Sequence, residues 1–271
     1  MTFPIDPLFG KIPERVHLNN SPLISVLGQA IFPKIIKISE EGYIGDFQES
    51  IRGDYPHLQR DNVQSVEVNL NQSGMRHQTI ETVVWRFFNL ERTIRVSLGT
   101  DSIVLEFSKY VSREEFISRA RSVLDALSST INPVAMIRVG CRYVDRIEGQ
   151  EHLNSLSKLI RPELLNILQP DLIEQVELSM TDITCKSKEG QLIVRYGMAP
   201  PNFTHDPDIA PPVSSPSWVL DIDSFNLEIQ EQRFDSDFIC DELNRLTGRA
   251  YAFFRWSITE EFLTFFGASK A

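Results

Sequence analysis

The chain has 271 residues, of which 42% are hydrophobic and 24% are charged, and its formal net charge is −10 with a pI near 5.1. This composition is typical of a soluble globular protein and excludes a disordered or fibrous chain. The negative charge disfavours general binding to nucleic acids or to anionic membranes, because an acidic surface repels phosphate groups.

Three cysteines, Cys141, Cys185 and Cys240, lie far apart in the sequence. Disulfide frameworks and zinc sites need paired spacing, so neither is expected, and a reducing compartment fits this cysteine content best. The first residues contain no basic segment followed by an apolar run, and no window of 18 residues is unbroken by polar residues. We therefore expect a cytoplasmic protein without a membrane segment.

The first half of the chain predicts an arm, a strand, a helix, a meander and a second helix. Residues 1–22 contain four prolines and predict an extended arm, residues 23–38 a strand and residues 40–51 a helix. Antiparallel strands are predicted at 63–70, 83–90, 93–98 and 102–107, with a turn at 71–74 and a tight connection at 99–101. Ser112 and Glu115 form a capping box, which places a long helix over residues 113–129.

Residues 136–146 predict the central strand, because apolar and basic side chains alternate along them with a period of two. One face of this strand would carry Ile137, Val139, Cys141 and Tyr143. The other face would carry Arg138, Gly140, Arg142 and Arg146. Such a strand covers a core on one side and presents guanidinium groups on the other.

The order of helix, antiparallel strands and long helix then recurs. Residues 153–168 predict helix, residues 175–185, 191–198 and 218–227 predict strands, Asp235 begins a long helix, and a cap at Ser257 to Glu260 opens a short one. We predict an α+β protein whose mainly antiparallel, curved sheet packs on two long helices. Two related halves, residues 1–149 and 150–271, and one continuous domain are both compatible with this pattern.

Residues 199–217 lie between the last two predicted strands and contain six prolines. This density prevents strand pairing and predicts a loop. The loop is either plainly exposed, or a lid or partner-binding strip.

Several common catalytic motifs are absent from the sequence. It contains no phosphate-binding loop, no dinucleotide-binding glycine turn, no zinc-protease helix, no Cys-x-x-Cys pair and no nucleophile elbow. The five histidines are widely separated in the sequence and are expected at the surface. We assign no catalytic residue, and the absence of these motifs favours a non-enzymatic protein over an enzyme.

Charged residues on strand faces are the one feature of the sequence that indicates a functional site. They are Arg86, Arg138, Arg142 and Arg195, with Asp221 and Asp223 on a further strand. The simpler interpretation is a solvated sheet face with cross-strand ion pairs. In the alternative, the arginines converge on an anionic ligand and the two aspartates hold Mg²⁺, since guanidinium groups suit phosphate and carboxylates suit the metal.

The motifs together resemble a sporadically distributed bacterial family of uncharacterised function. The matching residues are Pro22-Leu23, Trp85-Arg86-Phe87, Tyr110, Glu115-Phe116, Arg138 to Tyr143, Val219 to Asp223 and Ile258-Thr259-Glu260. Members usually have asparagine in place of Asp145 and leucine in place of Cys141, so the resemblance gives neither residue a role. It implies a single module in a prokaryotic cytoplasm and transfers no substrate or catalytic residue.

Two functions are compatible with the sequence. The first is a non-enzymatic binding or regulatory protein without a cofactor, acting through a protein partner or a homodimer, because the chain is acidic, lacks catalytic motifs and has aromatic-rich helices. The second is a phosphate-ligand or nucleotide-binding protein, or a metal-dependent phosphohydrolase, that uses the arginines with Asp221 and Asp223.

Overall fold

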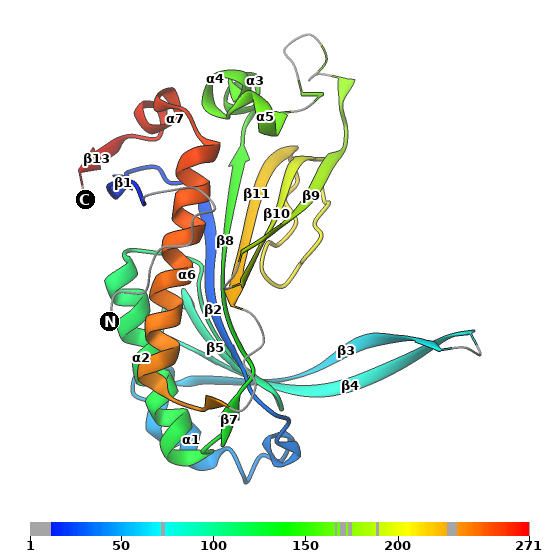
Figure 1. Ribbon diagram of the computed structural model, residues 1–271, viewed down its shortest axis with the longest axis vertical. Coiled ribbons are helices and arrows are strands. Elements are labelled where there is room, and N and C mark those ends of the chain that lie inside the picture. The colour runs from blue at the N-terminus through cyan, green and yellow to red at the C-terminus, as the bar shows by residue number, and fades with distance from the viewer. Residues whose placement is uncertain are drawn as a thin grey trace.

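The computed structural model describes residues 12–71, 74–165, 167–168, 172, 175–187, 190–226 and 232–270 (Figure 1). Its strands are β1 (Val16–Leu18), β2 (Leu23–Ile31), β3 (His57–Asn71), β4 (Gly74–Phe88), β5 (Ile94–Leu98), β6 (Ser102–Phe107), β7 (Ala135–Met136), β8 (Arg138–Glu148), β9 (Ser179–Lys186), β10 (Gly190–Ala199), β11 (Ser217–Asn226), β12 (Gln232–Arg233) and β13 (Ala268–Lys270). Its helices are η1, a 3-10 helix (Ile36–Ser39), and α1 (Gly45–Ile51), α2 (Arg113–Thr130), α3 (Gln150–Asn154), α4 (Leu156–Leu159), α5 (Pro162–Leu165), α6 (Ser236–Ser257) and α7 (Glu260–Phe265).

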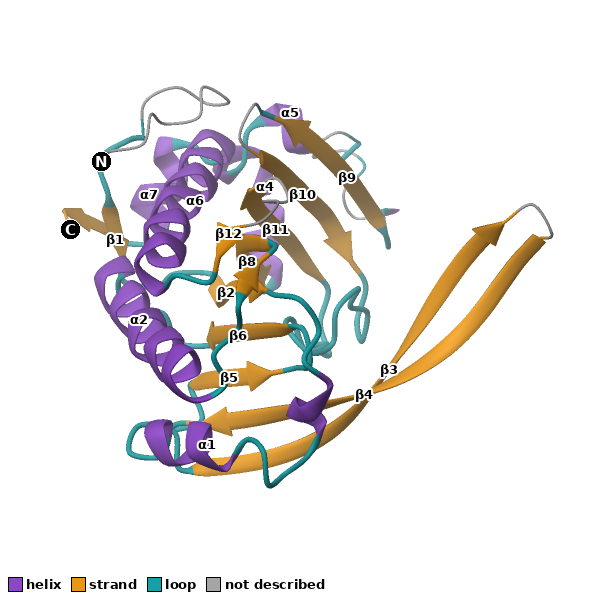
Figure 2. Cartoon of the chain, turned by 60° about the horizontal axis from the view of Figure 1, so that its bottom comes forward, coloured by secondary structure: helices purple, strands orange, loops and turns teal. Residues whose placement is uncertain are grey.

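Nine strands form one open antiparallel sheet in the order β3-β4-β5-β6-β2-β8-β11-β10-β9 (Figures 1 and 2). The α+β class predicted from the sequence is therefore confirmed. The sheet is continuous across residue 150, because β8 pairs with β2 on one side and with β11 on the other. A structural relationship between the two halves stays a prediction.

The two long helices, α2 and α6, pack on each other and on one face of the sheet. The hydroxyl of Ser112 accepts a hydrogen bond from the Glu115 N–H (3.1 Å), as the capping box predicts. Gly28 on β2 lets both helices approach closely, since an added Cβ would lie 2.8 Å from Phe116 Cζ and 3.1 Å from Leu243 Cδ2.

The two faces of β8 differ much as the alternation predicts. Val139 and Cys141 are fully buried beneath the helices, whereas Arg142 and Arg146 lie on the opposite face. Ile137 is the exception, because it lies between β7 and β8, where its N–H donates to the Ile31 carbonyl (2.7 Å).

Several predicted boundaries differ from the structure for local reasons. The strand predicted over 23–38 ends at Ile31, two residues before Pro33. The helical stretch predicted at 153–168, with an interruption at Pro162, forms α3, α4 and α5, and α5 begins at that proline. Thr259, not Ser257, caps α7: its hydroxyl accepts from the Phe262 N–H (3.2 Å), while the Ser257 hydroxyl donates to the Phe253 carbonyl. The predicted turn at 71–74 and the arm at 1–22 lie partly outside the described residues.

The β3–β4 hairpin extends well beyond the sheet (Figure 2). The two strands pair along their whole length, but β4 pairs with β5 only over Trp85 to Phe88. Residues 74–84 of β4 therefore have a neighbouring strand on one side only. At about 3.3 Å per residue they form a ribbon roughly 35 Å long.

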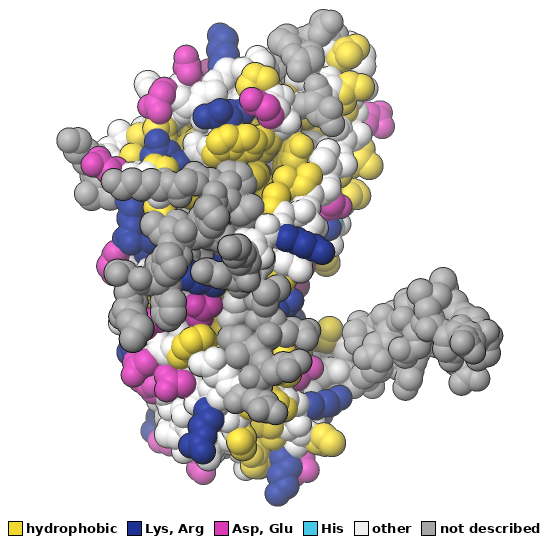
Figure 3. All heavy atoms as spheres, in the orientation of Figure 1, with side chains coloured by type: hydrophobic (Ala, Val, Ile, Leu, Met, Phe, Trp, Pro, Cys, Tyr) yellow, Lys and Arg dark blue, Asp and Glu magenta, His cyan; other side chains and the backbone are white. Residues whose placement is uncertain are grey.

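On the face shown in Figure 3, lysine and arginine side chains are interspersed with aspartate and glutamate side chains. None of the helices in the described part of the chain has both the length and the apolar character needed to span a bilayer.

Candidate functional site

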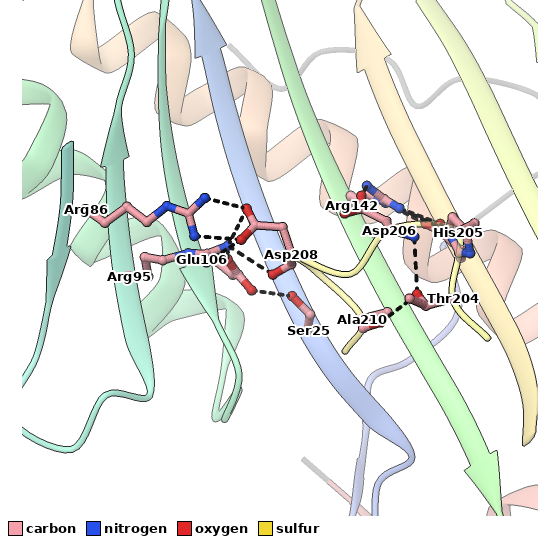
Figure 4. Close-up of polar contacts among 11 residues, drawn as sticks. Ser25, Arg86, Arg95, Glu106, Arg142, Thr204, His205, Asp206, Asp208 and Ala210 are labelled. Atoms are coloured by element: carbon pink, nitrogen blue, oxygen red, sulfur yellow. Dashed lines mark hydrogen bonds and ion pairs between the residues drawn. The ribbon is translucent and has the colours of Figure 1, made fainter. Parts of the chain in front are cut away.

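The proline-rich segment between β10 and β11 crosses the sheet face opposite to α2 and α6 (Figure 4). We call this segment, residues 200–216, the strap. The Thr204 hydroxyl donates to the Ala210 carbonyl (2.7 Å), which holds the strap in a compact turn. Ala210 packs with Val144 and Val219 of the sheet in a small apolar cluster. The strap is thus a packed segment, not a freely exposed loop.

Arg142 of β8 is the centre of the polar contacts beneath the strap (Figure 4). Its Nε and Nη2 donate to the two carboxylate oxygens of Asp221 (2.8 and 2.7 Å), and its Nη1 donates to Asp206 of the strap (2.7 Å). Nε2 of His205 donates to Asp221 Oδ2 (2.7 Å), because an ionised carboxylate can only accept. Asp221 is therefore fully engaged by its own chain.

Burial alone would disfavour the charged forms of this cluster, but the partners outweigh it. Asp221 and Asp206 raise the pKa of Arg142, although burial acts to lower it. Burial likewise acts to raise the pKa of Asp221, but the hydrogen bonds from His205 and Arg142 lower it overall. The cluster is charged at neutral pH and fastens the strap to the sheet.

Arg86 is held at a second attachment point of the strap. Its Nη1 and Nη2 donate to the two carboxylate oxygens of Asp208 (2.6 and 3.2 Å), and its Nε forms an ion pair with Asp61 (2.9 Å). Arg95 of β5 also donates to Asp208 (3.0 Å) and forms an ion pair with Glu106. The strap thus supplies the carboxylates that these arginines bind (Figure 4).

The remaining predicted residues lie in separate environments. The Nε of Arg195 donates to Asp182 (2.6 Å), and Arg138 lies over the Phe225 ring at 4.7 Å from its centroid. Asp223 faces Arg142 across β8 and β11, and burial raises the pKa of this carboxyl to about 6.

The structure does not bring the four arginines into one site. Arg86 on β4 and Arg142 on β8 lie four strands apart, which at about 4.8 Å per strand is roughly 19 Å. Within the described ranges no three or more His, Cys, Asp or Glu side chains are grouped in a way that could hold a metal ion. The anion site on the arginines and the Mg²⁺ site on Asp221 and Asp223 stay predictions without geometric support.

The helix side of the sheet contains a different kind of site, a cavity of about 240 Å³. It lies between β1, the end of β8, the start of α2 and the middle of α6. Leu18, Leu23 and Phe254 give it apolar walls, and hydroxyl and charged groups of other side chains also line it. A cavity with this mixed lining is typical of small-molecule sites.

Asp145 of β8 is the unusual residue of this cavity. It lies between Leu23 of β2 and Leu220 of β11, and only 5% of the residue is exposed. No described residue forms a hydrogen bond or an ion pair with its carboxyl group. Burial without a compensating partner raises its pKa to about 7.

Three tyrosines, Tyr110, Tyr143 and Tyr251, line the same cavity. The rings of Tyr110 and Tyr143 meet edge to face with centroids 5.9 Å apart, and burial raises the pKa of both phenols. Tyr251 of α6 accepts a hydrogen bond from the Val16 N–H (3.1 Å) and donates to the Glu14 carbonyl (3.1 Å). Tyr251 therefore fixes the segment that forms one wall.

That wall, residues 14–20, is also tied to distant parts of the chain. β1 pairs with β13, and the Asn19 N–H donates to the Gly267 carbonyl (3.2 Å). An ion pair between Arg15 and Glu114 joins the wall to the start of α2. Segments that lie far apart in the sequence thus form the walls of the cavity.

Our sequence analysis assigned no role to Asp145, although a signal for it was present. Asp145 continues the series Val139, Cys141 and Tyr143 at a period of two, so it falls on the face that covers the core. A carboxylate on such a face is rarely left without a partner unless it has a function.

Comparison with known proteins gives no match: no family model, curated protein or solved structure is similar to the chain. The family resemblance therefore stays a prediction.

We predict that Arg142→Ala destabilises the protein by about 3 kcal/mol, because it leaves the buried Asp221 carboxylate without its main partner. Arg195→Ala is the matched control, since its ion pair with Asp182 is largely exposed and should contribute less than about 1 kcal/mol. Urea unfolding measures both values. Equal losses in the two variants would show that the strap cluster is no stronger than a surface ion pair.

A second prediction concerns Asp145→Asn and pH. The folded state keeps a proton on Asp145 up to about pH 7, whereas the unfolded state releases it near its ordinary pKa. The protonated carboxyl group therefore stabilises the folded state at low pH. As pH rises toward about 7, its contribution to the free energy of unfolding falls by about 1.4 kcal/mol per pH unit. The asparagine variant lacks this loss, so its stability relative to wild type should rise by roughly 3 kcal/mol between about pH 5 and pH 8.

Taking the difference between variant and wild type removes the contributions of the other groups that face the cavity. These groups are Arg15, His17, Tyr110, Arg113, Glu114, Tyr143 and Tyr251. Urea unfolding at a series of pH values gives the difference. A difference that does not change with pH would mean that Asp145 titrates as an ordinary exposed carboxyl group.

Proposed function

We propose that the chain is a non-enzymatic binding protein that takes a small organic molecule into the cavity between β1, β8, α2 and α6. The observation that carries this proposal is the buried carboxyl group of Asp145, which lines the cavity and has no partner among the described residues. A buried polar group without a partner costs about 1–3 kcal/mol. A bound molecule that pairs with Asp145 would remove this penalty.

The size of the cavity limits the ligand. An apolar cavity of about 150 Å³ holds a benzene molecule. By the same proportion, the cavity of about 240 Å³ accommodates roughly ten non-hydrogen atoms. The part of a ligand that lies inside the cavity would therefore be the size of a small metabolite.

The position of the cavity supports a regulatory use of binding. One wall is the segment 14–20, which is held by Tyr251 and by the pairing of β1 with β13. A ligand that contacts this wall and Asp145 at once would stabilise the packing of residues 14–20 against the rest of the cavity. A partner that binds this region would then have different affinities for the liganded and the unliganded protein.

A thermal-shift screen tests the proposal with neutral, cationic, anionic and zwitterionic compounds of up to about ten non-hydrogen atoms. A ligand at about a hundred times its Kd should raise the Tm by roughly 5 °C or more. Ala250→Leu should abolish the shift, because Ala250 is buried and lines the cavity.

Gly42→Ala is the matched control, since an added Cβ there meets no atom within 4 Å. It should keep the full thermal shift. If no compound raises the Tm of the wild type by more than it raises the Tm of the Ala250→Leu variant, the cavity is not a binding site and the proposal fails.

The β3–β4 ribbon favours a second candidate function, self-association. An isolated two-stranded ribbon is only marginally stable in water, so one that extends roughly 35 Å from a sheet is expected to gain from a contact with a second copy. The outer edge of β3 also has unpaired backbone groups, because β3 is an edge strand. A homodimer would use this ribbon and leave the cavity free.

Shortening the ribbon tests this candidate. Replacing residues 64–81 with Asn-Gly joins the paired residues Val63 and Thr82 by a two-residue turn. Light scattering after size-exclusion chromatography should give a dimer for the wild type and a monomer for the shortened protein. A monomeric wild type, or an unchanged mass in the variant, would contradict self-association through the ribbon.

A further inference from the structure

The charge around Asp145 indicates what kind of molecule the cavity takes. Two arginines also line the cavity, but neither forms an ion pair with Asp145. Arg15 pairs with Glu114 at the start of α2. Arg113 reaches toward α6, where its Nη1 lies 3.9 Å from the position of a Cβ added at Gly248. Within the described residues, the carboxyl group in the cavity thus has no cation paired with it.

Aromatic side chains make up a large part of the lining. Tyr110, Tyr143, Tyr251 and Phe254 all line the cavity that holds Asp145. Aromatic rings attract cations through their negative faces, most strongly where water is excluded. A carboxyl group together with several aromatic rings is therefore an environment that favours a positive charge.

We infer that the ligand of this cavity is a small organic amine, bound as its ammonium ion by the Asp145 carboxylate, with its apolar body against Leu18, Leu23 and Phe254. This inference rests on the proposed function, because it specifies the class of molecule that the cavity binds. An ammonium group has three N–H donors and can satisfy the carboxylate and a neighbouring tyrosine hydroxyl at once.

Other classes of ligand fit the same lining less well. A carboxylate or phosphate that reached Asp145 would meet a like charge there, and two negative charges repel one another. A neutral alcohol could form one hydrogen bond with Asp145 but would leave an ionised carboxylate without a counter-ion. The amine alone supplies both the hydrogen bond and the charge.

Matched sets of compounds test this inference. Phenethylamine, phenethyl alcohol and hydrocinnamate share one apolar body, and pentylamine, pentanol and hexanoate share another. Calorimetric titration of the full chain at about pH 8 gives the affinity of each compound. In at least one set the amine should bind at least about tenfold more tightly than the alcohol, since charge-assisted hydrogen bonds are the stronger ones.

Asp145→Asn should remove this preference, so that amine and alcohol bind within about threefold of each other. The variant is nearly isosteric and removes a buried charge, so it should fold at least as well as wild type. Asp182→Asn is the matched control, because Asp182 is an exposed acid on the other face of the sheet, paired with Arg195. It should keep the full preference for the amine.

A measurement on the wild type alone gives an independent test. Amine affinity should fall about tenfold per pH unit below about pH 7, where Asp145 becomes protonated. The affinity of the alcohol should not follow this trend.

The outcomes separate the two proposals. If the alcohol or the carboxylate of a set binds as tightly as the amine, or if Asp145→Asn keeps the preference for the amine, the cavity binds small molecules but the inference about amines is wrong. If no compound of these sets or of the wider screen binds, the proposed function fails as well.

Discussion

The alternation of side chains along β8 determines where both charged regions of the molecule lie. Because successive residues of a strand point to opposite faces, Arg138, Arg142 and Arg146 fall on one side of the sheet. Tyr143 and Asp145 fall on the other side, together with the residues that the long helices bury. A shift of β8 by one residue would exchange the two sets, so the register of this central strand fixes the chemistry of each face.

The two faces differ in how their charges are satisfied. Beneath the strap, arginines and carboxylates of one chain pair with each other: Asp206 and Asp208 occupy Arg142 and Arg86 in the way that a bound anion would. In the cavity, the buried carboxyl group of Asp145 has no partner among the residues that the structure describes. Structural charge clusters are normally neutralised within the protein, so the site that is left incomplete is the better candidate for an external ligand.

Much of the fold could be predicted from local patterns. The capping box at Ser112, the alternation along β8 and the long helix after Asp235 each depend on residues near one another in the sequence, and the structure has all three. The resulting α+β class with a mainly antiparallel sheet followed from these elements. Predicted element boundaries were wrong where a single residue interrupted a longer apolar pattern, as Pro33 does after β2.

The sites were harder to predict, because they depend on which strands become neighbours. The sequence placed Arg86, Arg142 and Arg195 on polar faces, but it could not show that Arg86 would lie four strands from Arg142. Nor could it show that the strap would return over the sheet with carboxylates for Arg86 and Arg142. The alternation along β8 places Asp145 on the apolar face, but it could not show whether another strand or helix would supply a partner for the carboxyl group.

The pairing of β1 with β13 has a consequence for how the protein is made. These strands are about 250 residues apart in the sequence, so one wall of the cavity cannot be completed until β13 has been synthesised. Contacts across such a distance form late, because a long loop must close before they contribute. All strands of the nine-stranded sheet and the strap precede residue 227, so they are synthesised before β13, and competence to bind a ligand would arise as one of the last steps of folding.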